Sequence, residues 1–198
     1  MTNITVLDYP KVIGFDTGPG NCLMDCWCRI NKIGNYDDKG SWAASGNVNQ
    51  SLLENMMKDI YFSRNHPKST GPDYFNHEWI KDKLLLSSIK ISPQDVQATL
   101  LQVTVLSLIK SINSLELSDK DIYLCGGGVH NEFLCMEINK NCKTEVKTTA
   151  ELGIDPDYLE AICFAWLAKQ RIDKKSFNLN RITGSKGKVY LGRIYKPS

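Results

Sequence analysis

A carboxylate beside a glycine-rich turn is the first feature of this sequence that could do chemistry. A β-prone run ends at Asp16 and is followed by Thr17, Gly18, Gly20 and Asn21. Backbone amides and a helix N-terminus at such a turn would face a phosphate, and the carboxylate would hold magnesium or take a proton from a nucleophile. A turn that needs glycine for its backbone geometry, with Asp16 as a cap, explains the same residues.

Three successive glycines form a second candidate, at the end of another strand-like run. Gly126, Gly127 and Gly128 are followed closely by Asn131. Because these glycines carry no side chains, a flat ring could lie against the backbone. The segment is neither G-x-G-x-x-G nor a P-loop, and a flexible strand-to-helix turn is the alternative interpretation.

A third candidate is an irregular polar segment that precedes several aromatic residues. Lys68, Ser69 and Thr70 combine an ammonium group with two hydroxyls, which suits a sugar or a phosphate, although a solvated loop has the same composition. Glu160 lies in an otherwise apolar helical run. It could be a buried acid at a ligand, whereas an acidic residue by default faces solvent.

Alternating strands and helices should position these residues. Ile4–Leu7 and Val12–Phe15 predict a hairpin with a turn at 8–10, and helical spacing follows at Leu23, Met24, Trp27 and Ile30. Later helices are predicted from an apolar stripe (Val48, Leu52, Leu53, Met56, Met57 and Ile60), after Ser92-Pro93, from Asn131 to about Asn139, and over Tyr158–Lys169 with a cap near Asp155 or Pro156. Later strands are predicted at Asp121–Cys125 (buried), at Val146 and at Val189–Ile194. This order predicts an α/β fold with a partly parallel sheet, whose ligands bind beyond the carboxyl ends of the strands.

Composition narrows the classes of protein. The chain has 198 residues, 42% hydrophobic and 23% charged, which is typical of a soluble globular protein of one domain or two small ones. Its net charge of +2 gives no argument for a nucleic acid or a membrane surface, and no apolar run reaches the ~18–20 residues of a membrane helix. Seven cysteines without an export signal favour reduced thiols in the cytoplasm, and their spacing predicts no protein-held metal site.

Several blocks taken together resemble the anhydro-N-acetylmuramic acid kinase family, and their order and spacing match over nearly the whole chain. The blocks are Gly14–Asn21 with Leu23–Asp25, Pro67–Gly71 with Tyr74–Asn76, Asp95–Leu100, Cys125–Gly128 with Asn131, and Glu160–Ala161 before Phe164–Ala168. The family belongs to the sugar kinase, Hsp70 and actin superfamily. The resemblance implies a ribonuclease-H-like α/β domain with a mixed sheet flanked by helices, and ATP bound in a cleft between two such domains.

The resemblance also implies an activity. The family converts 1,6-anhydro-N-acetylmuramic acid, ATP and water to N-acetylmuramic acid 6-phosphate and ADP with magnesium, in peptidoglycan recycling and amino sugar catabolism. Asp16 matches its general base, which takes a proton from the water that attacks the anomeric carbon. Thr17, Gly18, Gly20 and Asn21 match the second phosphate loop, Gly126–Gly128 with Asn131 the adenosine side, and Lys68, Ser69, Thr70 and Glu160 the sugar side.

One departure from the family pattern changes the expectation. Family members are roughly twice as long, and their N-terminal half carries a first phosphate loop that this sequence lacks. Residues 1–198 therefore resemble the C-terminal kinase domain alone. Phosphoryl transfer needs positioning and charge stabilisation from both sides of the cleft, so we expect the chain by itself not to catalyse at a useful rate.

Three interpretations remain open. The first is a kinase domain that works with a separate N-terminal half or as a homodimer. The second is a binding module that holds a nucleotide or a sugar without chemistry, and the third is an inert remnant. A hydrolase that uses no nucleotide is the least favoured interpretation, because the sequence has no Gly-x-Ser-x-Gly motif.

Overall fold

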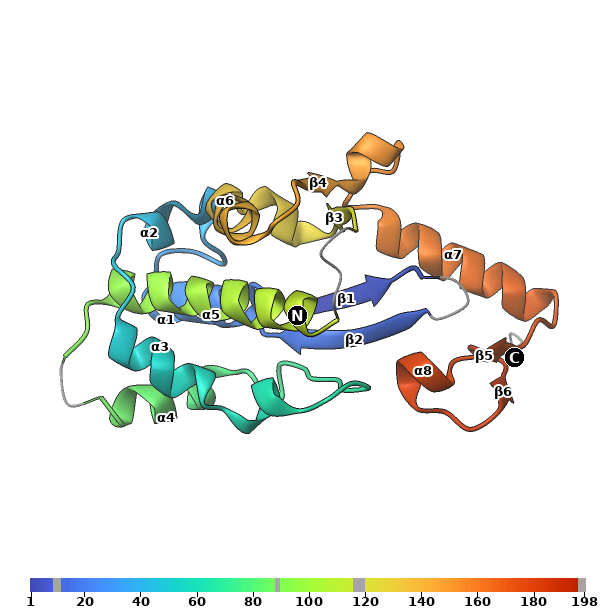
Figure 1. The fold of residues 1–198 in the computed structure, drawn as a ribbon, viewed down its shortest axis with the longest axis horizontal. Helices are drawn as coiled ribbons and strands as arrows, with labels where there is room; N and C mark the ends of the chain where they lie inside the picture. Colours follow the sequence, from blue (N-terminus) through green and yellow to red (C-terminus); the bar gives the residue numbers. More distant parts are fainter. Residues whose placement is uncertain (9–11, 88–89, 116–119, 196–198) are drawn as a thin grey trace.

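A long buried helix, α5 (Pro93–Ser114), organises the fold. We describe a computed structural model of residues 1–8, 12–87, 90–115 and 120–195. The helix begins as the sequence predicts, because the Ser92 hydroxyl accepts a hydrogen bond from the Asp95 amide (3.2 Å) and Pro93 occupies the first turn. Val96, Leu100 and Val103 are buried, and the helix packs against β1 and β2 and against the helices around it (Figure 1).

The predicted N-terminal hairpin is confirmed. Strands β1 (Thr2–Val6) and β2 (Ile13–Gly18) are antiparallel, with Ile4 opposite Phe15, and the predicted turn overlaps residues 9–11, which lie outside the described part. Helix α1 (Cys22–Ile30) follows directly and buries Leu23 and Met24. Trp27 and Ile30 lie in the helix as their spacing predicts, and Ile30 ends it with 40% of its surface exposed.

Short helices connect α1 to α5. They are η1 (Asp38–Gly40), α2 (Ser41–Ala44), α3 (Gln50–Met57), η2 (Ile60–Ser63) and α4 (His77–Leu85). The predicted apolar stripe is only partly correct. Asn49 caps the start of α3 and Asp59 caps η2, so Val48 and Ile60 fall outside the helix and are exposed.

The second strand–helix pair starts after α5. Strands β3 (Ile122–Leu124) and β4 (Val146–Thr148) are parallel, with η3 (Gly127–His130) and α6 (Glu132–Asn141) between them and η4 (Thr149–Leu152) after them. The Asn131 side chain caps α6 by accepting from the Leu134 amide (3.0 Å). The predicted buried strand Asp121–Cys125 is wrong in extent and burial, because only three residues pair and all three are half-buried.

The last quarter contains α7 (Leu159–Ile172), β5 (Phe177–Asn178), α8 (Asn180–Thr183) and β6 (Lys188–Val189). The predicted α7 is confirmed, but its cap is Tyr158, because the Asp155 carboxylate instead accepts from the Asp157 amide (2.9 Å). The predicted strand Val189–Ile194 is also wrong. It pairs only through β6, and residues 190–195 form no strand.

The strands do not join into one sheet. The described strands form three separate pairs, β1–β2, β3–β4 and β5–β6, where the sequence predicts a single mixed sheet. The α/β class is confirmed, because both strands and helices pack around α5 (Figure 1). No helix in the described ranges has the length and apolar character that would let it cross a membrane.

Candidate functional site

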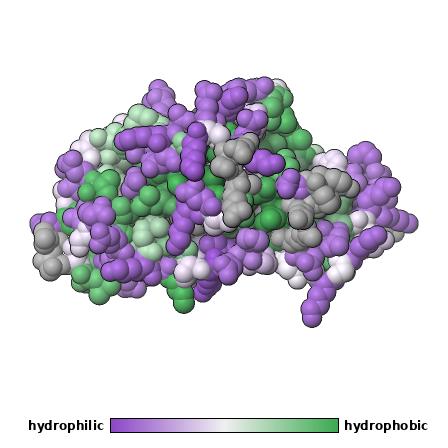
Figure 2. Space-filling view, viewed as in Figure 1, coloured by the Kyte–Doolittle hydropathy of each residue, from purple (hydrophilic) through white to green (hydrophobic). Residues whose placement is uncertain are grey.

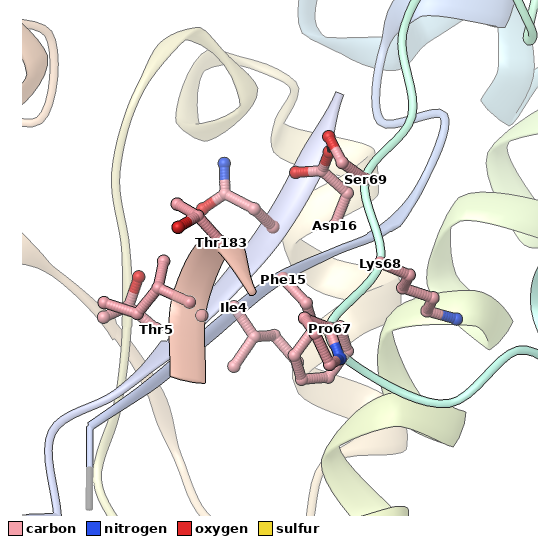
Figure 3. Close-up of a pocket in the computed structure, with 11 residues that line it drawn as sticks. Ile4, Thr5, Phe15, Asp16, Pro67, Lys68, Ser69 and Thr183 are labelled. Carbon is pink, nitrogen blue, oxygen red and sulfur yellow. Dashed lines mark hydrogen bonds between the residues drawn. The ribbon is translucent and has the colours of Figure 1, made fainter. Parts of the chain in front are cut away.

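Hydrogen bonds from a distant loop hold the Asp16 carboxylate in place. Its Oδ2 atom accepts from the Ser69 hydroxyl (2.9 Å) and from the Thr70 amide (2.9 Å). The main chain of Asp16 is held as well, because its amide donates to the Lys68 carbonyl (3.1 Å) and its carbonyl accepts from the Tyr61 hydroxyl (2.8 Å). Figure 3 shows Asp16 and Ser69 pointing toward one another. Both of these hydrogen bonds are made to Oδ2. Because a carboxylate group is rigid and planar, they also fix the direction in which Oδ1 points.

A pocket of about 490 Å³ lies beside this carboxylate. Its walls come from β1, β2, the segment 67–69 and α8 (Figure 3). The polar side chains in the lining are those of Asn3, Thr5, Asp16, Lys68, Ser69 and Thr183. Hydroxyl, amide and carboxylate groups around an apolar floor suit a polar ring such as a sugar.

Lys68 turns its ammonium group away from Asp16 (Figure 3). Its Nζ donates to the Tyr61 carbonyl (3.3 Å) and lies 4.8 Å from the centre of the Tyr61 ring. Burial lowers the pKa of Lys68, and the positive charge of Lys110 lowers it further. The lysine side chain therefore stabilises the segment 61–70 on the side away from the Asp16 carboxylate. Ser69 and Thr70 bind that carboxylate, whereas Lys68 contacts Asp16 through its main-chain carbonyl.

The glycines after Asp16 are required by close packing. A Cβ atom at Gly18 would lie 2.5 Å from the Ser107 hydroxyl, and one at Gly20 would lie 2.8 Å from the Met1 carbonyl carbon. Gly20 also has a φ of +57°, which disfavours other residues. Thr17 donates to the Thr2 carbonyl (3.2 Å). The turn-geometry interpretation thus accounts for both glycines.

A substitution at Gly18 tests this packing. Gly18→Ala is expected to lower the free energy of unfolding by about 1–2 kcal/mol, because the new methyl group overlaps Ser107 on α5. Ser107→Ala removes the nearest atom, so the double variant should recover part of the loss in urea titrations. Equal losses in the single and the double variant would contradict the packing role.

Two predicted site residues carry buried oxygens that make no hydrogen bond with any part of the chain that is described. They are Asn21 Oδ1, at the start of α1, and Thr70 Oγ1, whose own amide binds Asp16. Buried polar atoms are normally paired, so these two oxygens are exceptions, and neither residue lines the pocket beside Asp16.

The second glycine loop is open where the first is packed. A Cβ atom at Gly126, Gly127 or Gly128 would meet no described atom within 4 Å. The Gly126 amide donates to the Pro156 carbonyl (2.9 Å), which brings the loop beside the start of α7. Glu160 lies in the first turn of α7, which follows Pro156, and its charge raises the pKa of Cys125 in addition to the larger effect of burial. Glu160 itself is exposed, in accord with the solvent-facing alternative.

Asp59 and Tyr61 support the Asp16 site and were not singled out from the sequence. Asp59 accepts from the Tyr74 hydroxyl (2.7 Å), the Trp79 indole (2.9 Å) and the Tyr61 amide (3.0 Å), and pairs with Lys83 (3.3 Å). Burial alone would raise its pKa, but these hydrogen bonds and Lys83 outweigh it and lower the pKa. The partners are 2–24 residues apart in sequence, so no short motif marks them.

The fold and the site define an α/β domain with a loop-held carboxylate beside a polar pocket and an open glycine loop after a second strand. Residues 1–197 match the family of anhydro-N-acetylmuramic acid kinases, and the chain belongs to that family.

Relatives that carry this name differ from the chain in length. The relative from Coxiella burnetii is 47% identical over 93% of this chain and 50% of its own length. Those from Haemophilus influenzae and Pseudomonas syringae pv. tomato are 42% and 39% identical over 98% of this chain and 54% of their lengths. The chain thus spans about half the length of these relatives.

Proposed function

We propose that this chain is the C-terminal half of a cytoplasmic sugar kinase that acts on 1,6-anhydro-N-acetylmuramic acid in peptidoglycan recycling and amino sugar catabolism. The half would have a ribonuclease-H-like plan. The reaction would consume ATP and water and yield N-acetylmuramic acid 6-phosphate and ADP. The observation that carries the proposal is the Asp16 carboxylate, held by Ser69 and Thr70 at the wall of a polar pocket.

Asp16 would act as the general base. A water placed in the pocket next to the carboxylate would lose its proton to Asp16 as its oxygen bonds to the anomeric carbon of the sugar. The bond from that carbon to O6 would break, and O6 would take the γ-phosphoryl group of ATP, releasing ADP. Ser69 and the Thr70 amide would keep the carboxylate oriented toward that water. A positioned base of this kind contributes roughly 10²–10⁴-fold to a rate.

The nucleotide would lie against the second glycine loop. Gly126–Gly128 leave room for a flat base, and Asn131 anchors the end of the loop. When bound, ATP with magnesium supplies the transferable phosphoryl group. Magnesium keeps several waters and binds phosphate oxygens, which the nucleotide would provide. No three His, Cys, Asp or Glu side chains of the described residues cluster as a metal site.

Turnover would need the other half of the family's sequence. Phosphoryl transfer depends on charge stabilisation from both sides and on exclusion of water. We therefore propose that the chain works with an N-terminal half or in a homodimer, and that alone it binds ligands without useful turnover. The competing candidate is a module that binds a nucleotide or a sugar without chemistry. It would bind the same ligands, but addition of the N-terminal half would not produce turnover.

Calorimetric titration of the purified, monodisperse chain with magnesium–ADP, with and without the anhydro sugar, tests the nucleotide half of this proposal. We expect saturable binding that Gly127→Asp abolishes, because the new carboxylate fills the open face of the loop and repels phosphate. No positive φ is recorded at Gly127, so the substitution should leave the fold intact. Gly34→Asp, in an exposed loop, is the matched control. A folded chain that does not bind, or binding that survives Gly127→Asp, would refute this site.

A further inference from the structure

Helix α7 is apolar and yet has no buried face. Ile162, Phe164 and Trp166 are 53%, 63% and 49% exposed. Every residue from 161 to 166 is exposed, and at 3.6 residues per turn this stretch covers the whole circumference of the helix. A helix that is hydrophobic all round is normally buried. The side chains of α7 are therefore suited to a larger assembly than the structure contains.

The exposure extends to the whole C-terminal quarter. Among the described residues, none after Thr149 is buried, and half-buried side chains are the most enclosed ones there. The aromatic and cation–π contacts that α7 makes with described residues stay within this quarter, namely Trp166 with Phe177 (5.4 Å between ring centres) and Arg171 over Tyr190 (5.6 Å), whereas α8 packs on β2. On the face in Figure 2, hydrophobic side chains also reach the surface around the start of α7. Apolar surface of this extent marks an interaction site.

The position of α7 connects this surface to the candidate site. Its first turn follows Pro156, whose carbonyl binds the open glycine loop. Its C-terminal end leads into α8, which packs on β2 and supplies Ile182 and Thr183 to the pocket beside Asp16. A protein domain bound to α7 would therefore lie next to both the proposed nucleotide loop, Gly126–Gly128, and the proposed base, Asp16.

We propose that α7 and the exposed apolar side chains after it are the docking surface for the N-terminal half of the family's sequence, which this chain does not span. The inference rests on the proposed function, in which that half supplies the other wall of the cleft. The relatives carry about as much sequence again, since the chain covers 50–54% of their length. A second copy is less suited, because pairing one helix with its copy covers a single stripe and leaves the other faces of α7 in water.

The test is assembly with the half of the Coxiella burnetii relative that lies outside the match, which is its N-terminal half under the proposed function. Co-expressed with the 198-residue chain, it should form a one-to-one complex by light scattering, without nucleotide. Phe164→Glu should weaken the complex roughly tenfold or more, because an unpaired charge would be buried at the interface. Tyr36→Glu, at an aromatic residue that is 64% exposed in the loop after α1, should leave it unchanged.

A soluble, folded half that does not bind would overturn the inference. So would a complex that Phe164→Glu and Tyr36→Glu leave equally tight, or a homodimer of the chain that Phe164→Glu disrupts, since that would assign α7 to a second copy. If the half does not fold separately, it can be fused to the N-terminus of the chain, before Met1, as one polypeptide. Hydrogen exchange over 159–172 should then slow at least tenfold relative to the chain alone, and unchanged exchange would reject the proposal. Because none of these measurements uses ADP, a failed nucleotide titration remains separate from a failed docking test.

Discussion

Replacing Asp16 with asparagine should lower turnover of the reconstituted kinase by roughly 10²–10⁴, the contribution of a positioned general base. The assay is ADP release from the chain combined with the N-terminal half of a relative, with the anhydro sugar as substrate. An amide has nearly the shape of a carboxylate and can still accept from Ser69 and the Thr70 amide through its oxygen. Its uncharged oxygen, however, cannot take the proton of the attacking water. The affinity for magnesium–ADP should change much less than the rate.

Two variants bracket this result. Asp38→Asn, at an exposed acid on η1, is the matched control and should retain full turnover. Ser69→Ala should cause a smaller loss, because it removes one of the two bonds to Oδ2 and leaves the base itself. Turnover of Asp16→Asn within threefold of the unchanged protein would eliminate Asp16 as the base, even if ADP still binds.

The second large effect concerns stability and comes from Asp59. Asp59→Asn should lower the free energy of unfolding by about 3 kcal/mol, measured by urea titration at neutral pH. The Asp59 side chain is only 9% exposed and accepts from two side chains and one amide. An asparagine would place its NH₂ group among these donors and lose the attraction to Lys83. Asp82→Asn, at an exposed position in α4, should change stability little.

The same residue predicts a dependence on pH. The pKa of Asp59 is lower in the folded protein than the usual value of about 3.9 for an unfolded chain. Its contribution to stability is therefore complete above that value and disappears as the pH falls through the lower, folded pKa. The difference in unfolding free energy between the unchanged protein and Asp59→Asn should stay constant above about pH 5 and shrink below about pH 4. If this difference in unfolding free energy stayed constant until the protein unfolds in acid, the charge of Asp59 would make no contribution to stability.

Local signals in the sequence were enough for the elements whose ends are determined by nearby residues. The cap at Ser92, the hairpin of β1 and β2 and the glycine turn before α1 depend on residues a few positions apart, and each forms as predicted. The family, too, followed from blocks of residues that can be read without coordinates. Short strands and the ends of weak helices were less predictable, as at Val189–Ile194 and Ile60, because pairing and packing partners decide them.

The sequence by itself determined the residue types available at the site: one carboxylate before a glycine turn, a hydroxyl pair after Lys68 and an open run of three glycines. Only the tertiary structure decided how they combine. It joined Ser69 and Thr70 to Asp16 across more than fifty residues, turned Lys68 toward Tyr61, and used Gly18 for contact with α5. It also left α7 uncovered. The reason is physical: bond and packing partners distant along the chain meet only when the core closes, so local spacing carries no record of them.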